Sequence, residues 1–129
     1  VGVGKAGLLQ GEGDRPLKAT GTWLGALFES LATQSVRVYA DAAGAQVGHL
    51  RTKDTSREID LIVEGADRRV VAIEVKLADT VSDQDVRHLT WLKQQIGDRL
   101  VSTMVITTGE FAYQRPDGVA VVPLALLGP

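Results

Sequence analysis

The stretch that decides the fold is REIDLIVEGADRRVVAIEVKL, residues 57–77. Two runs rich in Val, Ile and Leu lie on either side of the segment 65–68, whose Gly, Ala, Asp and Arg are typical of a turn. In both runs apolar side chains recur at every second position, as they do in a strand with a buried face. The stretch therefore predicts an antiparallel hairpin with strands over 57–64 and 69–77.

The apolar faces of the two strands fix how they pair. A shift of one residue would turn every apolar side chain to the wrong side, so the pairing must keep both apolar sets together. The pairs that do so are Ile59 with Val75, Leu61 with Ile73, and Val63 with Val71. This register places Asp60 directly opposite Glu74, with Cβ atoms about 4.5–5.5 Å apart.

Two facing carboxylates repel one another, so one must be protonated, or both must share a cation or a metal ion. Mg2+ prefers carboxylate oxygens and keeps several waters, one of which can attack a phosphate. Lys76, on the same strand face as Glu74, can orient that water or stabilise charge on the phosphate. The alternative is a solvated sheet face with ordinary ion pairs, where Glu58 and Glu64 would compete as ligands.

A third carboxylate lies upstream, on a helix predicted from Gly21 to about Tyr39. Apolar residues recur there mostly at three- and four-residue spacing. One side of this helix carries small residues and a single acid, Glu29, so it can approach the sheet closely. If that side meets the sheet near Asp60, Glu29 becomes a supporting metal ligand or an anchor for water. In the glycine-rich segment 1–18, apolar residues do not recur at helix or strand spacing, so we expect a loop or a poorly ordered arm.

The remaining segments complete an α/β pattern. We expect a strand over 47–53, a helix over 82–97, a strand over 100–107, and a last strand or extended edge over 119–127. Ser82 and Asp85 are spaced as in a capping box at the start of the second helix. A chain of 129 residues suffices for one core but not for two ordinary domains, so 19–129 should form a single domain.

Composition narrows the function. The 14 basic and 16 acidic residues give a formal charge of -2, which excludes a dense positive field, so any contact with nucleic acid must be local or assisted by metal. The absence of cysteine excludes disulfides and thiolate metal sites. No apolar run reaches the roughly 20 residues of a membrane span, and no signal peptide is evident, which predicts a cytoplasmic protein.

The first residues allow two further expectations. The chain begins with Val1 rather than Met, which predicts a fragment of a longer polypeptide. The pair Gly4-Lys5 is followed by Ala6, where a phosphate-binding loop requires Ser or Thr, so we expect no nucleotide to bind here.

Taken together, the acids and the lysine resemble a known family. Glu29 in Leu-Phe-Glu-Ser, Asp60 in Arg-Glu-Ile-Asp-Leu-Ile-Val-Glu, and the triplet from Glu74 to Lys76 look like the E, D and E-x-K signature of the PD-(D/E)XK nuclease superfamily. More narrowly, residues 21–127 resemble DUF4143, the C-terminal domain that follows the ATPase domain in many bacterial and archaeal AAA-type ATPases. The Arg-Thr-Lys-Asp turn and the Asp-Gly-Val-Ala-Val-Val-Pro-Leu run fit this family too.

The resemblance implies a restriction-endonuclease-like α/β core, in which a central mixed sheet with an antiparallel hairpin is flanked by helices. It also implies that Glu29, Asp60, Glu74 and Lys76 occupy the active-site positions. It does not by itself imply activity, because superfamily folds persist after catalysis is lost.

Four further residues are predicted to contact substrate. In some nucleases of the superfamily the helix after E-x-K carries a Gln and, four residues on, a Tyr; here Gln84 is followed by His88, which departs from that pattern. Arg51 and Lys53 give the hairpin region positive charge that can meet phosphates. The alternatives are an exposed polar helix side and basic residues that balance the acids.

Two functions follow from these patterns. The first is a nuclease dependent on Mg2+ or Mn2+, endo- or exonucleolytic, that cuts DNA in preference to RNA, with Asp60, Glu74 and Glu29 at the metal and Lys76 assisting the nucleophile. The second is a non-catalytic accessory module that docks on the ATPase domain of the same longer chain or recognises a nucleic-acid or protein partner. A homo-oligomer is compatible with both, and no membrane partner is expected.

Overall fold

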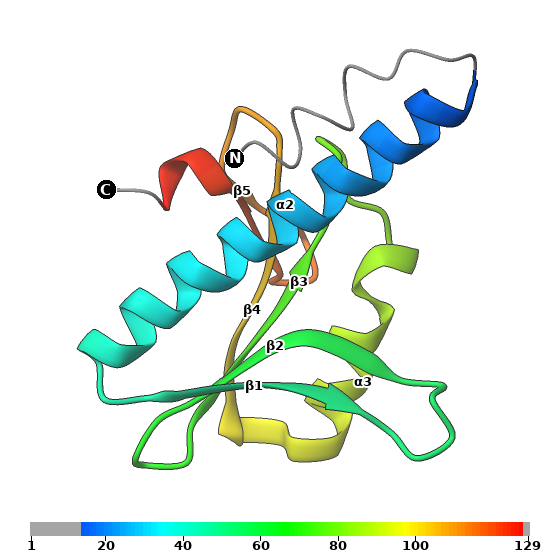
Figure 1. The fold of residues 1–129 in the computed structure, drawn as a ribbon. Coiled ribbons are helices and arrows are strands. Elements are labelled where there is room, and N and C mark those ends of the chain that lie inside the picture. Colours follow the sequence, from blue (N-terminus) through cyan, green and yellow to red (C-terminus); the bar gives the residue numbers. More distant parts are fainter. Residues whose placement is uncertain (1–13, 128–129) are drawn as a thin grey trace.

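A computed structural model describes residues 14–127, with side chains described from residue 21 onward (Figure 1). The glycine-rich residues 1–13 lie outside the described part of the chain. The helices are α2 (Asp14–Ala42) and α3 (Arg87–Ile96), and the short 3-10 turns are η1 (Gln84–Val86), η2 (Gly97–Arg99) and η3 (Leu124–Leu126). The strands are β1 (Gln46–Arg51), β2 (Glu58–Glu64), β3 (Val70–Val75), β4 (Leu100–Thr107), β5 (Tyr113–Gln114) and β6 (Ala120–Pro123).

The strands form one mixed sheet in the order β1-β2-β3-β4-β6-β5. β1, β2 and β3 are antiparallel neighbours, while β3 pairs parallel with β4, and β4 pairs parallel with β6. A parallel pair needs a crossover, and α3 lies in the connection from β3 to β4. α2 and α3 cover opposite faces of the sheet (Figure 1), so the fold is mixed α/β as expected.

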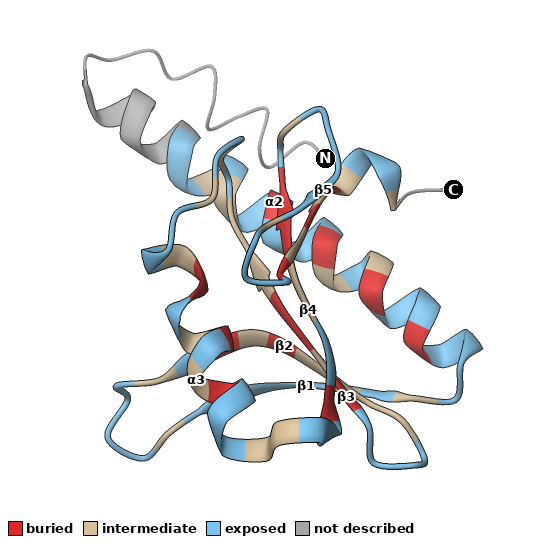
Figure 2. Ribbon diagram, turned by 180° about the vertical axis from the view of Figure 1, so that it is seen from behind, coloured by how far each residue is buried: buried red, intermediate tan, exposed pale blue. Residues whose placement is uncertain are grey.

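Each face of the sheet has its own core. On the α2 face, Phe28, Ala32 and Val36 are buried at four-residue spacing, which brings them to one side of the helix. On the α3 face, Leu89 and Leu92 are buried against the sheet. Buried residues therefore concentrate in the central strands and on the inner side of α2, as Figure 2 shows.

The first helix is longer than its apolar pattern predicts. It begins at Asp14, ahead of the predicted start at Gly21, so the last residues of the predicted arm are helical. It ends at Ala42, just before Gly44, whose positive φ of 70° is a conformation that glycine adopts without strain. No helix within residues 14–127 has the length and apolar character needed to cross a membrane.

Two of the three predicted pairs in the β2–β3 hairpin are confirmed, whereas the third, Ile59 with Val75, is not formed because the regular pairing ends at Leu61 and Ile73. Leu61 pairs with Ile73, and Val63 pairs with Val71. The strand over 100–107 is also confirmed as β4. The predicted last strand is shorter, because β6 ends at Pro123 and the chain continues as η3, and the short strand β5 was not predicted.

A β-bulge changes the faces of β2. Gly48 of β1 pairs with Ile62, but Leu50 pairs with Ile59, so β2 has one residue more than β1 between these pairs. Ile59 therefore packs in the core under α3, whereas Leu61 packs in the core under α2. The prediction that Ile59, Leu61 and Val63 share a face is wrong for Ile59, because the bulge reverses the alternation between positions 59 and 61.

Candidate active site

The centre of the site is the predicted pair, Asp60 and Glu74. The backbone N–H of Asp60 donates to Oε1 of Glu74 at 2.9 Å, and the backbone N–H of Val75 donates to Oδ2 of Asp60 at 2.8 Å. The regular pairing of β2 with β3 stops one position earlier, at Leu61 and Ile73. The two carboxylates thus take the place of backbone carbonyls where the strands separate, and each is held by the opposite strand.

Burial makes this pair a poor place for two negative charges. Desolvation raises the pKa of Glu74 from 4.5 to about 7, against the opposing effect of the hydrogen bond from Asp60. Desolvation also raises the pKa of Asp60, partly offset by the N–H of Val75, and the charge of Glu58 adds to the rise. Burial therefore disfavours two ionised carboxylates here, and a proton or a bound cation would offset their charge.

Lys76 does not contact these acids. Its Nζ forms an ion pair with Oδ2 of Asp85, and both side chains are partly buried. The same carboxylate accepts the backbone N–H of Ser82 at 2.8 Å and its hydroxyl at 3.0 Å, which is half of the predicted capping box. Although burial opposes it, hydrogen bonds from Lys76 and Ser82 hold the pKa of Asp85 below its ordinary value. The lysine expected to assist a nucleophile is thus engaged elsewhere.

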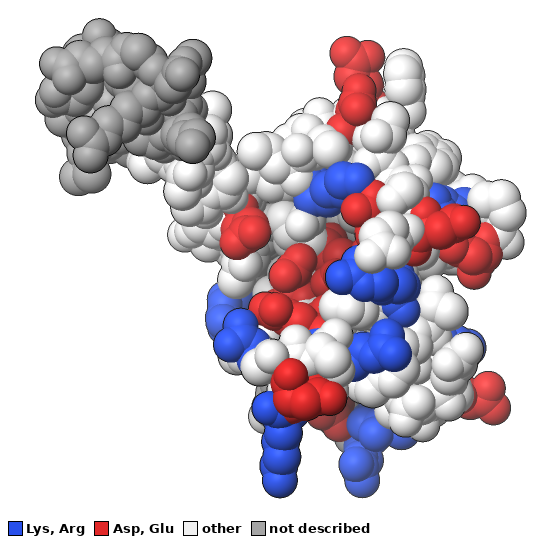
Figure 3. Space-filling view, turned by 90° about the vertical axis from the view of Figure 1, so that its right-hand side faces the viewer, with Lys and Arg blue, Asp and Glu red and all other residues white. Residues whose placement is uncertain are grey.

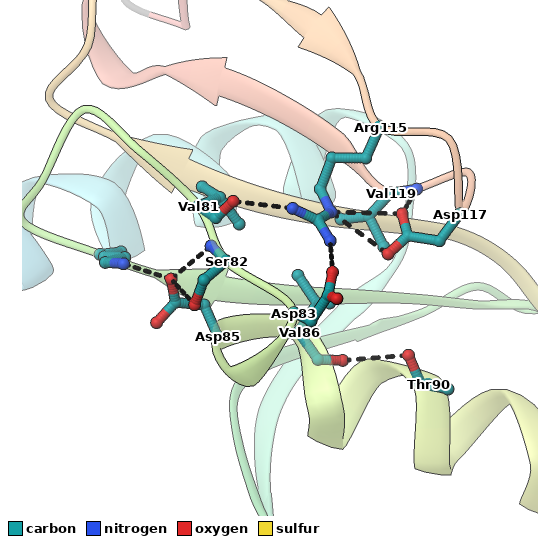
Figure 4. Close-up of polar contacts among 10 residues, drawn as sticks. Val81, Ser82, Asp83, Asp85, Val86, Thr90, Arg115, Asp117 and Val119 are labelled. Carbon is teal, nitrogen blue, oxygen red and sulfur yellow. Dashed lines mark hydrogen bonds and ion pairs between the residues drawn. The ribbon is translucent and has the colours of Figure 1, made fainter.

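Arg115 fixes the segment that holds Asp85, and no sequence signal pointed to it (Figure 4). Its side chain is only 11% exposed. Its guanidinium donates to the carbonyl of Val81 at 2.7 Å, to Asp83 at 2.5 Å and to Asp117 at 3.2 Å. These bonds join the β5–β6 turn to the loop before η1, and a lone arginine in a Pro-Asp-Gly turn does not reveal such a role.

Glu29 is exposed on α2 and does not form a three-carboxylate cluster with Asp60 and Glu74. Within the described residues, no group of three or more His, Asp or Glu side chains is arranged to hold a metal ion. Asp60 instead opens onto a hollow of about 290 Å³ between α2, β1 and β2, and Glu29 is not among its lining residues. The lining residues are Thr33, Arg37, Gly48, His49, Glu58, Asp60 and Leu61. Glu29 precedes Thr33 by one helical turn, so it lies beside this hollow rather than in it.

Two of the predicted substrate contacts are engaged with β2. The Nδ1 of His88 contacts the backbone of Glu58, at 3.1 Å from its nitrogen and 2.6 Å from its oxygen. Arg51 forms an ion pair with the Glu58 carboxylate at 3.2 Å. Gln84 lies in η1 and Lys53 in the turn after β1, and both are exposed. His88 and Arg51 therefore hold Glu58 beside the pair.

Two basic residues that sequence reasoning missed are Arg37 and His49, which line the hollow with Asp60. The only available signal was that His49 lies on β1, next to the strand that carries Asp60.

The donor set fits a hard divalent cation. Oδ1 of Asp60 and Oε2 of Glu74 accept no hydrogen bond from any described residue, so each carboxylate keeps one oxygen for a ligand. Mg2+ is commonly held by one or two carboxylates together with waters and substrate phosphates. Figure 3, which views the right-hand side of Figure 1, shows acidic side chains gathered across the middle of that face with Lys and Arg around them.

The fold and the site define a mixed α/β domain with a two-carboxylate centre at a strand separation. Residues 24–127 match the sequence model of the family described as Domain of unknown function (DUF4143), and the chain belongs to this family. No curated protein and no solved structure matches the chain.

Proposed function

We propose that this domain is a divalent-cation-dependent phosphodiesterase of the PD-(D/E)XK type that acts on DNA. The observation that carries the proposal is the Asp60–Glu74 pair, which is half-buried, is held by reciprocal backbone hydrogen bonds, and has the pKa of both carboxyls raised by desolvation. Such perturbed carboxylates cluster at functional sites. The bulge beside Asp60 adds support, because bulges are over-represented next to active sites.

In this proposal Asp60 and Glu74 hold Mg2+ or Mn2+ through their free oxygens, and Glu74 releases its proton when the ion binds. The bound ion would polarise a phosphate and lower the pKa of a water. Glu29 anchors a water from α2, and Lys76 serves the reaction only after it separates from Asp85. These two steps distinguish this chain from a site in which all four groups already converge.

DNA contacts in this proposal are local, because the chain carries a formal charge of -2. Arg37 and His49 lie beside Asp60 and approach the phosphate nearest the pair. Lys53 and Gln84 are exposed and contact the DNA backbone on either side of that phosphate. Arg51 and His88 act mainly by holding Glu58.

The test is cleavage of linear and circular DNA by the purified chain in Mg2+ or Mn2+, with calorimetry of Mn2+ binding. Asp60→Asn and Glu74→Gln should abolish both cleavage and binding, and Lys76→Ala should abolish cleavage alone. Asp98→Asn is the matched control, because Asp98 is exposed and its side chain makes no hydrogen bond to a described residue. Cleavage that survives in both Asp60→Asn and Glu74→Gln would reject the proposal.

The ion pair of Lys76 with Asp85 favours a second candidate, a non-catalytic module that docks on an ATPase domain in the cytoplasm. In that case the chain binds neither Mn2+ nor DNA, and Asp85→Asn does not create cleavage. Cleavage by the wild-type chain would exclude this candidate.

A further inference from the structure

α2 has two apolar faces, and the described chain covers only one of them. Phe28, Ala32 and Val36 face the sheet and are buried. Five of the ten large apolar side chains that are exposed in the described residues also lie on α2. They are Leu24, Leu27, Leu31, Val38 and Tyr39, and we call them the outer stripe. A surface helix ordinarily has one apolar face, so the second requires an explanation.

The outer stripe has the spacing of a helix–helix seam. Leu24, Leu27, Leu31 and Val38 follow one another at steps of three, four and seven residues, as in a heptad repeat. The charged residues between 21 and 42 are Glu29, Arg37 and Asp41, which fall outside this seam at 100° per residue. The stripe therefore presents apolar side chains without charge, as the core of an interface does.

The two ends of the outer stripe differ, because one runs beside a groove and the other presents exposed leucines. Toward the C-terminal half of α2 lies a groove of about 400 Å³. Its lining residues are Leu31, Gln34, Ser35, Val38, Tyr39 and Leu127. The hydroxyl of Tyr39 donates to the carbonyl of Leu127 at 2.5 Å, which fixes one wall. Leu24 and Leu27 project from the other half of the same stripe, so each copy carries both a ridge and a groove.

We propose that the outer stripe binds a second copy of this chain, with the two α2 helices antiparallel about a two-fold axis at Leu31. That symmetry sets Leu24 of each copy against Val38 of the other and Leu27 against Ser35. The ridge of each copy therefore enters the groove of the other. An isologous contact of this kind closes at the dimer.

The exposed area is enough for the apolar core of such a dimer. Val38 is 67% exposed and Leu31 is 44% exposed. The five side chains together expose on the order of 400 Å² of apolar surface, about the size of the largest patch on a typical monomer. A standard interface buries roughly 800 Å² on each partner. The outer stripe would supply about half of that as its apolar core, with the neighbouring polar side chains as the rim.

The first test is the mass of the full chain by sedimentation equilibrium over a range of concentrations. The wild-type chain should dimerise reversibly, and Leu31→Asp, which places two carboxylates on the axis, should raise the Kd more than tenfold. Val38→Asp should do the same and is the safer variant for folding because Val38 is so exposed. Ala26→Asp, on an exposed side of α2 outside the stripe, is the matched control and should leave the Kd unchanged.

A second test fixes the register. The chain has no cysteine, so an introduced thiol is the only one present. Leu31→Cys treated with diamide should give a disulfide-linked dimer, because the axis brings residue 31 of both copies together. A mixture of Leu24→Cys and Val38→Cys chains should cross-link to one another, whereas Ala26→Cys should not. A wild-type chain that stays monomeric up to its solubility limit, or a dimer that both aspartate variants leave intact, would overturn the proposal.

Discussion

Lys76 and Asp85 form an ion pair that ties the end of β3 to the turn before α3. Both side chains lie mostly out of solvent, and Asp85 also binds the hydroxyl and backbone N–H of Ser82. The pair therefore fixes the loop that leads into α3 and at the same time keeps the lysine from the neighbouring carboxylates.

The substitution Asp85→Asn should separate these two effects. It removes a charge-assisted hydrogen bond, so the free energy of unfolding in urea should fall by about 1–2 kcal/mol. If Lys76 serves DNA cleavage, the freed lysine should also raise the cleavage rate in Mn2+. Ser82→Ala is the control, because it loses one bond to Asp85 but leaves the ion pair in place. A loss of stability without any change in cleavage would show that the pair is only structural.

The stability of the domain should depend on pH through Glu74. Its pKa is about 7 in the folded chain and about 4.5 in an unfolded one, so between these values the folded state holds more protons. The free energy of unfolding should therefore fall as pH rises from about 4.5 to 7, and the raised pKa of Asp60 acts in the same direction. Thermal melts across this range should show the fall, and Glu74→Gln should flatten it. A melting temperature that rises over this interval would contradict the assignment.

Metal binding should restore the stability that the domain loses as the pH rises toward 7. If Asp60 and Glu74 bind Mn2+, the ion competes with the Glu74 proton, so affinity should rise as pH increases toward and through about 7. Calorimetry in buffers of different ionisation enthalpy should detect the released proton. Glu29→Gln should leave the affinity nearly unchanged, because Glu29 does not line the hollow beside Asp60, whereas Asp60→Asn should abolish binding. Equal losses in both variants would place Glu29 in direct contact with the ion.

Arg115→Gln should destabilise the chain more than an ordinary surface change. It leaves the carbonyl of Val81 without its donor and removes the ion pair with Asp117, which keeps the backbone N–H of Val119, at a cost of about 2–3 kcal/mol. Arg68→Gln is the control, because Arg68 is exposed and its ion pair with Glu64 is 3.9 Å long; its effect should stay within about 0.5 kcal/mol. Similar urea midpoints for the two variants would refute a stabilising role for Arg115.

The hairpin could be predicted from sequence because its alternation has only one register that buries both apolar faces. That is why Asp60 and Glu74 were correctly placed side by side. The bulge in β2 could not be predicted, because it depends on how β1 pairs with β2 rather than on β2 alone. The two-residue alternation of a regular strand therefore assigned Ile59 to the wrong core.

The polar contacts of the site were harder to predict than its strands. Lys76 has acids on its own strand and on the loop beyond, and only the folded chain shows that it pairs with Asp85. The position of Glu29 depends on the angle at which α2 crosses the sheet, which helical spacing does not set. The role of Arg115 arises from segments far apart in the chain.

The extra residue in β2 also makes the position of Asp60 depend on the assembly of both hydrophobic cores. Ile59 and Leu61, on either side of Asp60, are anchored in different layers of the molecule. Asp60 therefore takes up its position only when both layers have assembled, and either layer alone would leave it untethered. A probe that senses occupancy of this acid, such as luminescence of a lanthanide captured there, would consequently report the completion of folding rather than the formation of a single hairpin.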